Sequence, residues 1–285
     1  MAGTVSGVAG VAGRGVRRGA IYAIAIGVGL LVVVPVAYAV LGGFRTTGQI
    51  ADRPVGLPDP WVFDNYREIL ASDTFWQQLR NSVVVAAITM GVVVPGGSLA
   101  AFALARLSFR GREAVYTLFT LGLLFPLTVA ILPLFITLRS VDLLNSPLGV
   151  ALPQAAFALP MSIIVLRPFF RAIPVELEEA AAIDGCGPFG FFWRIALPMS
   201  RPVLATVSVL VIVASWNAFV LPLVVLNDPK MWTLPLGVTN FSTQYSSDTA
   251  RVLAFTSLSM VPALVFYVIA ERQIVSGLAS GALKG

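Results

Sequence analysis

The residues of this sequence that could do chemistry are few and of few types. The chain contains no histidine and one cysteine, Cys186. Without an imidazole there is no histidine general base, proton relay or metal ligand, so the HExxH zinc motif is excluded. A Gly-x-Ser-x-Gly nucleophile motif is also missing. We therefore expect Cys186 to be an inert thiol, and we expect that the chain is not an enzyme.

Nucleotide chemistry is excluded in a similar way. A phosphate-binding loop needs Gly-Lys followed by Ser or Thr. The two lysines, Lys230 and Lys284, instead follow a proline and a leucine. The sequence therefore predicts no cofactor and no metal in this chain, and no ATP hydrolysis by this chain alone.

One short segment, which begins at Pro174, combines acidic and small residues. Pro174 suits the start of a helix because its missing N–H is not needed there. Glu176, Glu178 and Glu179 follow at once, where negative charge complements the helix dipole. Gly185 suits a left-handed C-terminal cap. We expect a helix of about two to three turns here, outside the bilayer.

This helix is a candidate docking site. Ala180 and Ala181 carry little side-chain bulk, so another protein surface could approach closely, while Glu179 and Asp184 would place charge at the edge of the contact. The alternative interpretation is an ordinary surface helix that links two membrane spans.

The elements that must hold this helix are unusually apolar. Hydrophobic residues make up 57% of the chain and charged residues 12%, about half the charged fraction of a soluble domain. Six stretches carry no charge, and each is long enough for the roughly 20 helical residues that cross a bilayer. We expect six membrane-spanning helices, at residues 19–44, 81–105, 114–138, 143–166, 202–227 and 252–270. Buried helices of a large soluble protein are the disfavoured alternative.

The orientation follows from the positive charges. With the N-terminus inside, 12 of the 19 Lys and Arg residues fall in inner segments, which favours both termini in the cytoplasm. The net charge of +5 is then a property of a membrane protein and does not indicate nucleic-acid binding. A cleavable signal peptide ending near Ala39 is disfavoured, because the first apolar stretch is too long. The expected organisation is a cytoplasmic tail (1–18), a six-helix domain (19–275) with a cytoplasmic loop (170–201), and a C-terminal tail (276–285).

Polar residues inside the spans could line a substrate path. Ser215, Trp216 and Asn217 lie together in the fifth predicted span, where an indole beside an amide could contact a substrate. Serine and asparagine can instead bridge neighbouring helices, so both interpretations stay open.

The cytoplasmic loop resembles the EAA loop of binding-protein-dependent ABC importer permeases. Glu179-Ala180-Ala181, then Gly185, then Ile195-Ala196-Leu197-Pro198 match that pattern and its spacing. The segment from Ala101 to Arg106 is similar to carbohydrate-uptake permeases, and residues 273–285 resemble the C-terminus of the maltose-importer G-type subunit. Cys186 stands where the family often has alanine.

The resemblance implies a six-helix type I importer fold in a bacterial cell membrane, all-α, with a cytoplasmic coupling helix. It implies a second permease subunit, two ATP-binding subunits that carry ATP and Mg, an extracytoplasmic solute-binding protein and a sugar or oligosaccharide substrate. The positions that it assigns to coupling with the ATPase are Glu179, Ala180, Ala181, Ile183, Asp184, Gly185, Leu197 and Pro198. The positions that it assigns to a tail contact with the ATPase are Gly277, Gly281 and Lys284.

Two alternatives remain at this point. An ion-coupled secondary transporter usually has ionisable residues within its spans, and the six predicted spans contain none. An ABC importer of a polyol or a glycerol-phosphate-type solute would have similar loops, so the sequence does not name the substrate.

Overall fold

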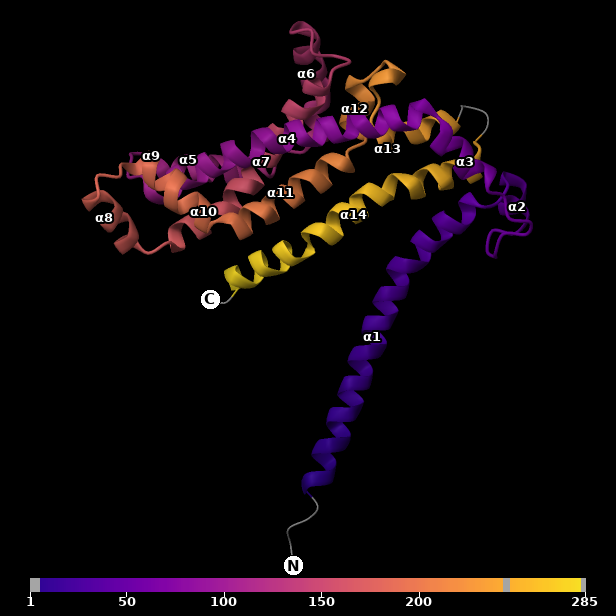
Figure 1. The fold of residues 1–285 in the computed structure, drawn as a ribbon, viewed down its shortest axis with the longest axis horizontal. Coiled ribbons are helices and arrows are strands. Elements are labelled where there is room, and N and C mark those ends of the chain that lie inside the picture. The colour runs from indigo at the N-terminus through magenta and orange to yellow at the C-terminus, as the bar shows by residue number, and fades with distance from the viewer. Residues whose placement is uncertain (1–5, 243–246, 283–285) are drawn as a thin grey trace, which may run out of the picture. The chain divides into compact units, whose positions relative to one another are not determined.

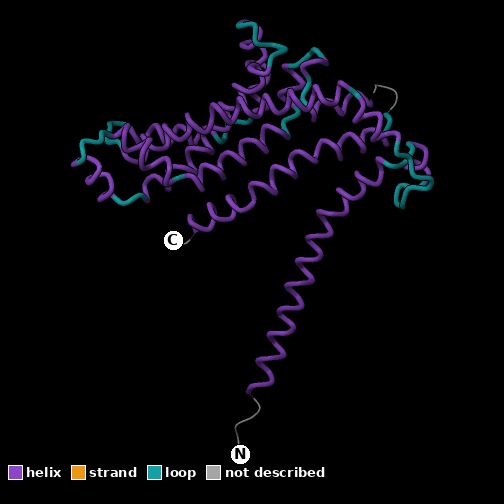
Figure 2. The backbone as a smooth tube through the Cα atoms, in the orientation of Figure 1, coloured by secondary structure: helices purple, strands orange, loops and turns teal. Residues whose placement is uncertain are grey.

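A computed structural model describes the backbone of residues 6–242 and 247–282, and the side chains of 19–242, 247–268 and 271. In that part of the chain the regular structure is helical, with short loops between helices and without a β-strand (Figure 2). The chain divides into two compact units, Met1–Ile69 with Phe241–Leu258, and Leu70–Asn240 with Ser259–Gly285.

The first unit contains a long apolar helix and a hydrogen-bonded turn that follows it. It is built from α1 (Ser6–Gly43), α2 (Thr47–Asp52), α3 (Asp64–Ala71) and the first part of α14 (Thr249–Ala282). Asn65 donates to the carbonyls of Gly43 and Arg45 at 2.9 Å each, and the Tyr66 hydroxyl donates to Val40 at 2.7 Å. These bonds satisfy carbonyls that the end of α1 leaves without intrahelical partners.

The second unit is a bundle around three helices. Figure 1 shows α4 (Asp73–Arg106), α7 (Pro147–Ala172) and α11 (Arg201–Trp216) side by side. Val93, Ala101, Ile163, Leu166 and Val207 are buried where these helices meet. The shorter elements of this unit are α5 (Arg112–Gly122), α6 (Leu127–Ser140), α8 (Val175–Ile183), α9 (Pro188–Phe191), the π-helix η1 (Phe192–Ala196), α10 (Leu197–Met199), α12 (Val220–Val225), the 3₁₀ helix η2 (Pro229–Met231), α13 (Leu234–Gly237) and most of the 3₁₀ helix η3 (Val238–Phe241).

The predicted spans are present, but two of them are not straight. Within the described residues, Gly19–Gly43, Asp73–Arg106, Pro147–Ala172 and Thr249–Val268 are long and apolar enough to cross a bilayer. Two bent helix pairs, Arg112–Gly122 with Leu127–Ser140 (97°) and Pro188–Met199 with Arg201–Trp216 (78°), complete six spans if each pair counts as one.

The breaks differ from the sequence-based expectation of one helical span over each of residues 114–138 and 202–227. The first stretch breaks before Leu127, because Pro126 has an extended backbone and cannot donate to the preceding turn. The second stretch ends as a helix at Trp216, and Val220–Val225 forms a separate short helix. In the bent pair, the helix that accompanies Arg201–Trp216 comes before it in the sequence, at residues 188–199. We had expected these residues to belong to the cytoplasmic loop (170–201).

Each expected tail continues into its neighbouring helix without a break. α1 begins at Ser6 and runs through residue 18, and α14 continues through residue 275 to Ala282. A domain boundary at either position is therefore not marked by a change in secondary structure.

Candidate functional site

The helix expected in the acidic segment is α8, and it is capped at its C-terminus as the glycine predicts. Pro174 is the N-cap residue, one position earlier than expected, and Glu176 and Glu178 lie in the first turn. Gly185 has φ +77°. Its N–H bonds to the Ala182 carbonyl at 3.0 Å, and the Cys186 N–H bonds to Ala181 at 2.8 Å. These two bonds form a Schellman motif, which ends the helix sharply.

The two central alanines of α8 have different surroundings. Ala180 is exposed, but Ala181 is 6% exposed and belongs to the main core of the bundle. A flat outward face made of both alanines, as the sequence analysis expected, is therefore absent. The outward side presents instead Glu179, Ala180, Asp184 and Ile183, whose side chain is 87% exposed.

Arg106, the last residue of α4, holds α8 to the bundle. Its Nη1 donates to the Ile173 carbonyl at 2.9 Å, just before α8, and its Nε donates to Glu178 at 2.9 Å. Its Nη2 lies 2.6 Å from the same carboxylate oxygen. The Arg106 side chain is 9% exposed, so this ion pair is shielded from water and from salt more than a surface pair would be. Arg106 therefore links α8 directly to the end of α4.

A second buried arginine joins α7 to its neighbours at the same end of the bundle. Arg167 donates from Nε to the Leu104 carbonyl at 3.1 Å and from Nη2 to Glu113 at 2.5 Å. Its guanidinium lies 3.9 Å from the centre of the Tyr116 ring, a distance typical of a cation–π contact. One side chain thus links α7 with the end of α4 and the start of α5.

The segment that returns from α8 combines buried and exposed aromatic residues. Phe191 and Phe192 are buried in the main core, while Phe189 and Trp193 are exposed. The π-helical turn at Phe192–Ala196 directly precedes Leu197 and Pro198. A proline ring collides with the carbonyl four residues earlier, and a widened turn relieves that collision. Leu197 is half-buried and Pro198 is exposed.

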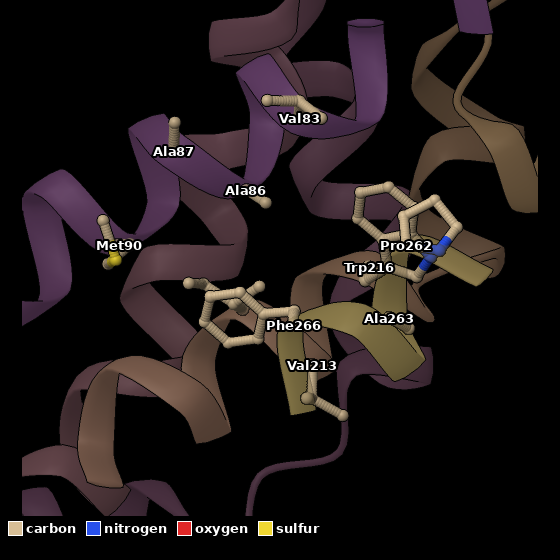
Figure 3. Close-up of a pocket in the computed structure, with 10 residues that line it drawn as sticks. Val83, Ala86, Ala87, Met90, Val213, Trp216, Pro262, Ala263 and Phe266 are labelled. Atoms are coloured by element: carbon tan, nitrogen blue, oxygen red, sulfur yellow. The ribbon is translucent and has the colours of Figure 1, made fainter. Parts of the chain in front are cut away.

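The three residues predicted for a substrate path do not converge on one site. Ser215 donates to Oε1 of Gln154 on α7 at 2.6 Å. Trp216 donates to the Ser259 carbonyl at 3.2 Å and lines a hollow of about 260 Å³ with Met90 and Phe266 (Figure 3). Asn217 donates to Val213 of its own helix at 2.9 Å, which caps the last turn of α11. Ser215 thus bonds to a polar side chain of the bundle, whereas Trp216 and Asn217 donate to backbone carbonyls.

The predicted tail contacts are described only in part. Gly277 and Gly281 lie within α14, and Lys284 lies outside the described residues.

Sequence reasoning did not identify Arg106 and Arg167 as residues that position the site. Arg106 ends a segment that was singled out, Ala101 to Arg106, but its partner Glu178 is 72 positions away. One feature of the sequence could have identified them: each arginine directly follows a charge-free stretch. A charge buried at such a position would be costly without a partner, so a partner was to be expected.

Comparison with known proteins identifies the family. The family described as "Binding-protein-dependent transport system inner membrane component" matches residues 93–273. The chain belongs to this family. The match includes the C-terminal part of α4, α8 and the return segment, so it covers the features just described.

Curated relatives of this permease match over nearly its whole length. It is 34% identical over 257 residues to the "Diacetylchitobiose uptake system permease protein NgcG" of Streptomyces coelicolor, covering 90% of this chain and 85% of that protein. It is 35% identical over 277 residues to the "Trehalose transport system permease protein SugB" of Mycobacterium tuberculosis, covering 95% and 100%.

A solved structure shares the fold of the permease. A chain of a bacterial ABC transporter "involved in the import of the acidic polysaccharide alginate" aligns with a TM-score of 0.69, at 21% identity, over 89% of this chain and 95% of that one. The two chains therefore share a fold.

Proposed function

We propose that this chain is one of two permease subunits of an ATP-driven importer of sugars or oligosaccharides, and that α8 is its coupling helix. The relatives named for diacetylchitobiose and trehalose uptake support the substrate class. The observation that carries the coupling role is the anchoring of α8 by Arg106, which leaves Glu179, Ala180, Ile183 and Asp184 facing outward.

The coupling works through a rigid path. Two ATP-binding subunits would bind ATP and Mg, close, and push on the exposed face of α8. Ala181 and Glu178 carry that push inward, because one is packed in the core and the other is bonded to Arg106. From there α4 moves with α8, and Arg167 makes α5 and α7 follow.

The distribution of Lys and Arg supports the orientation of the chain. With both termini in the cytoplasm, α8 and the two arginines lie on the cytoplasmic side, as the distribution of Lys and Arg indicates. A solute-binding protein would deliver the sugar to the opposite side. Leu197 and Pro198 would support the coupling helix from the return segment.

Reconstitution tests the proposal. The chain is co-purified with its second permease and ATP-binding subunits and placed in liposomes, with the binding protein added to the extracytoplasmic side. We expect uptake of labelled trehalose or diacetylchitobiose that requires both ATP and the binding protein. Uptake driven by a proton or sodium gradient without ATP would instead identify a secondary transporter.

A variant separates the coupling role from assembly. Glu179 is exposed and makes no ion pair among the described residues, so Glu179→Lys leaves the bundle intact. We expect the variant to reach the membrane in normal amounts but to lose ATP-driven uptake. Normal uptake by this variant would remove Glu179 from the docking face.

A further inference from the structure

Gln154, a polar residue of the bundle, has one amide atom without a hydrogen-bond partner among the described residues. Gln154 on α7 is half-buried, and its Oε1 accepts from Ser215 at 2.6 Å and lies 3.2 Å from the Thr89 hydroxyl. Thr89 has one proton, and the carbonyl of Val85 at 2.8 Å is its nearer acceptor. The other amide atom of Gln154, Nε2, has no hydrogen-bond partner among the described residues.

One amide atom of Gln154 lacks a hydrogen-bond partner in either orientation of the amide group. If the amide nitrogen faces the two hydroxyls, it donates to them, and the amide oxygen takes the unpartnered place. In either orientation one polar atom remains for a ligand. A sugar hydroxyl suits both cases, because it donates and accepts.

The amide borders a hollow whose other walls are apolar and aromatic. A cavity of about 220 Å³ is lined by Gln154, Thr89, Ser215, Phe157 and Val211. A second hollow of about 230 Å³ continues it along α7 and α11 and shares Phe157, Ala158, Val211 and Ala214. Most of the lining is hydrophobic, with few polar groups, which is the usual composition of a small-molecule site.

The aromatic wall adds a second element of carbohydrate recognition. Phe157 lines both hollows, and its ring is held nearly parallel to Phe125, at 18° and 6.5 Å between centres. The electron-rich face of an aromatic ring attracts the C–H groups of a sugar. An amide and a phenyl ring on neighbouring turns of α7 can therefore contact a hydroxyl and a C–H face of the same ring.

We propose that Gln154 is a substrate-contacting residue of the translocation path, with Phe157 as its aromatic neighbour and Ser215 as the group that orients the amide. The inference rests on the proposed function. It differs from the sequence-based choice of Asn217 and Trp216, whose side-chain nitrogens donate to backbone carbonyls. It also explains a half-buried amide at a depth where unsatisfied polar groups are costly.

The test uses the reconstituted complex and the sugar that the wild-type complex imports from a panel of trehalose and diacetylchitobiose. Uptake kinetics and binding-protein-stimulated ATP hydrolysis are measured in parallel for Gln154→Leu. The control is Ser208→Ala on α11, because Ser208 lines neither hollow and its hydroxyl already donates to Leu204 of its own helix at 2.8 Å. We expect Gln154→Leu to lower kcat/KM for uptake by about tenfold or more, with ATP hydrolysis unchanged and the control near wild type.

A labelling experiment adds a direct measure of contact. In a Cys186→Ser background, Gln154→Cys is treated with a small thiol reagent with and without the imported sugar. We expect the sugar, delivered by its binding protein, to slow the reaction.

Other outcomes overturn the inference. Unchanged uptake by Gln154→Leu would show that the amide does not contact substrate, while the proposed importer function would stand. A parallel loss of uptake and ATP hydrolysis would show that Gln154 only holds the helices together. Uptake by the wild-type complex that is driven by a proton or sodium gradient without ATP would remove the proposed function and this inference with it.

Discussion

Arg106 and Glu178 are 72 positions apart in the sequence, but the arginine Nη2 lies 2.6 Å from a carboxylate oxygen of Glu178. The pair fixes the start of α8 to the end of α4. Arg106 also donates to the carbonyl that directly precedes α8. The helix proposed to receive the force of the ATPase is therefore bonded at its base to the longest helix of the bundle's core.

This relationship predicts energetic coupling between the two side chains. Arg106→Met, Glu178→Met and the double variant form a cycle, measured by thermal unfolding of the complex and by sugar moved per ATP. A charged hydrogen bond contributes roughly 1.5–3 kcal/mol, so we expect the double variant to lose clearly less than the two singles together. Glu176→Met is the control, because Glu176 is an exposed acid of the same helix without an ion pair among the described residues. Strict additivity of the two single variants would contradict the coupling.

The glycine that ends α8 gives a second prediction, which depends on backbone conformation alone. A Cβ on Gly185 would meet nothing within 4 Å, but its φ of +77° is unfavourable for a β-branched residue. We expect Gly185→Val to destabilise the helix end by about 1–2 kcal/mol and to lower ATP-driven uptake, with Gly185→Asn milder. Gly187→Val is a matched control, since Gly187 is also unobstructed and has φ −70°. Equal effects at both glycines would show that the cap geometry is unimportant.

In the ion pair between Arg167 and Glu113, we expect substitution of the arginine to destabilise the protein more than substitution of the glutamate. Arg167 is 6% exposed in its side chain, and Glu113 is 61% exposed. Glu113→Gln should lower the unfolding temperature only slightly, because exposed ion pairs contribute little to stability. Arg167→Lys should cost more, because lysine does not reproduce both the bond to Leu104 and the planar contact with Tyr116. The measurement is thermal unfolding of the purified complex, and a larger loss for Glu113→Gln would contradict this account.

Two side chains one turn apart on α4 predict effects of opposite sign. Gln78 is fully buried, and neither amide atom has a hydrogen-bond partner in the described part of the chain. Asn81 is also buried, but it donates to the carbonyls of Lys230 and Trp232 at 2.8 and 3.0 Å. Gln78→Met removes an unsatisfied group, whose cost is about 1–3 kcal/mol, and should raise the unfolding temperature.

Asn81→Leu serves as the comparison. It deprives two carbonyls of their donor and should lower the unfolding temperature. A destabilised Gln78→Met variant would show that the amide is satisfied in the assembled protein.

The sequence predicted the class of fold well, because the signals are local. Charge-free stretches of bilayer length and the acidic start and glycine end of α8 each act over one helix. The positions of the bend before Leu127 and of the end of α11 at Trp216 were not predicted, because they depend on how the surrounding helices pack.

The candidate site was predicted only where its residues lie close together in the sequence. Glu179, Asp184 and Gly185 lie in one segment with a recognisable pattern. The burial of Ala181, the bond from Arg106 to Glu178 and the contact of Ser215 with Gln154 depend on how distant helices pack, and no spacing in the sequence encodes those contacts. Ser215, Trp216 and Asn217 are consecutive, but successive residues of a helix face in different directions.

The docking of α8 on a nucleotide-binding subunit is tested most directly by crosslinking from single cysteines in native membranes. In a Cys186→Ser background, Ile183→Cys and Ala180→Cys lie on the exposed side of α8, and Ala181→Cys lies in the core. We predict that the two exposed positions capture an ATP-binding subunit, that ATP changes the yield, and that the buried position captures none. Intact, transporting complexes in which neither exposed position ever captures such a subunit would contradict the coupling role of this helix.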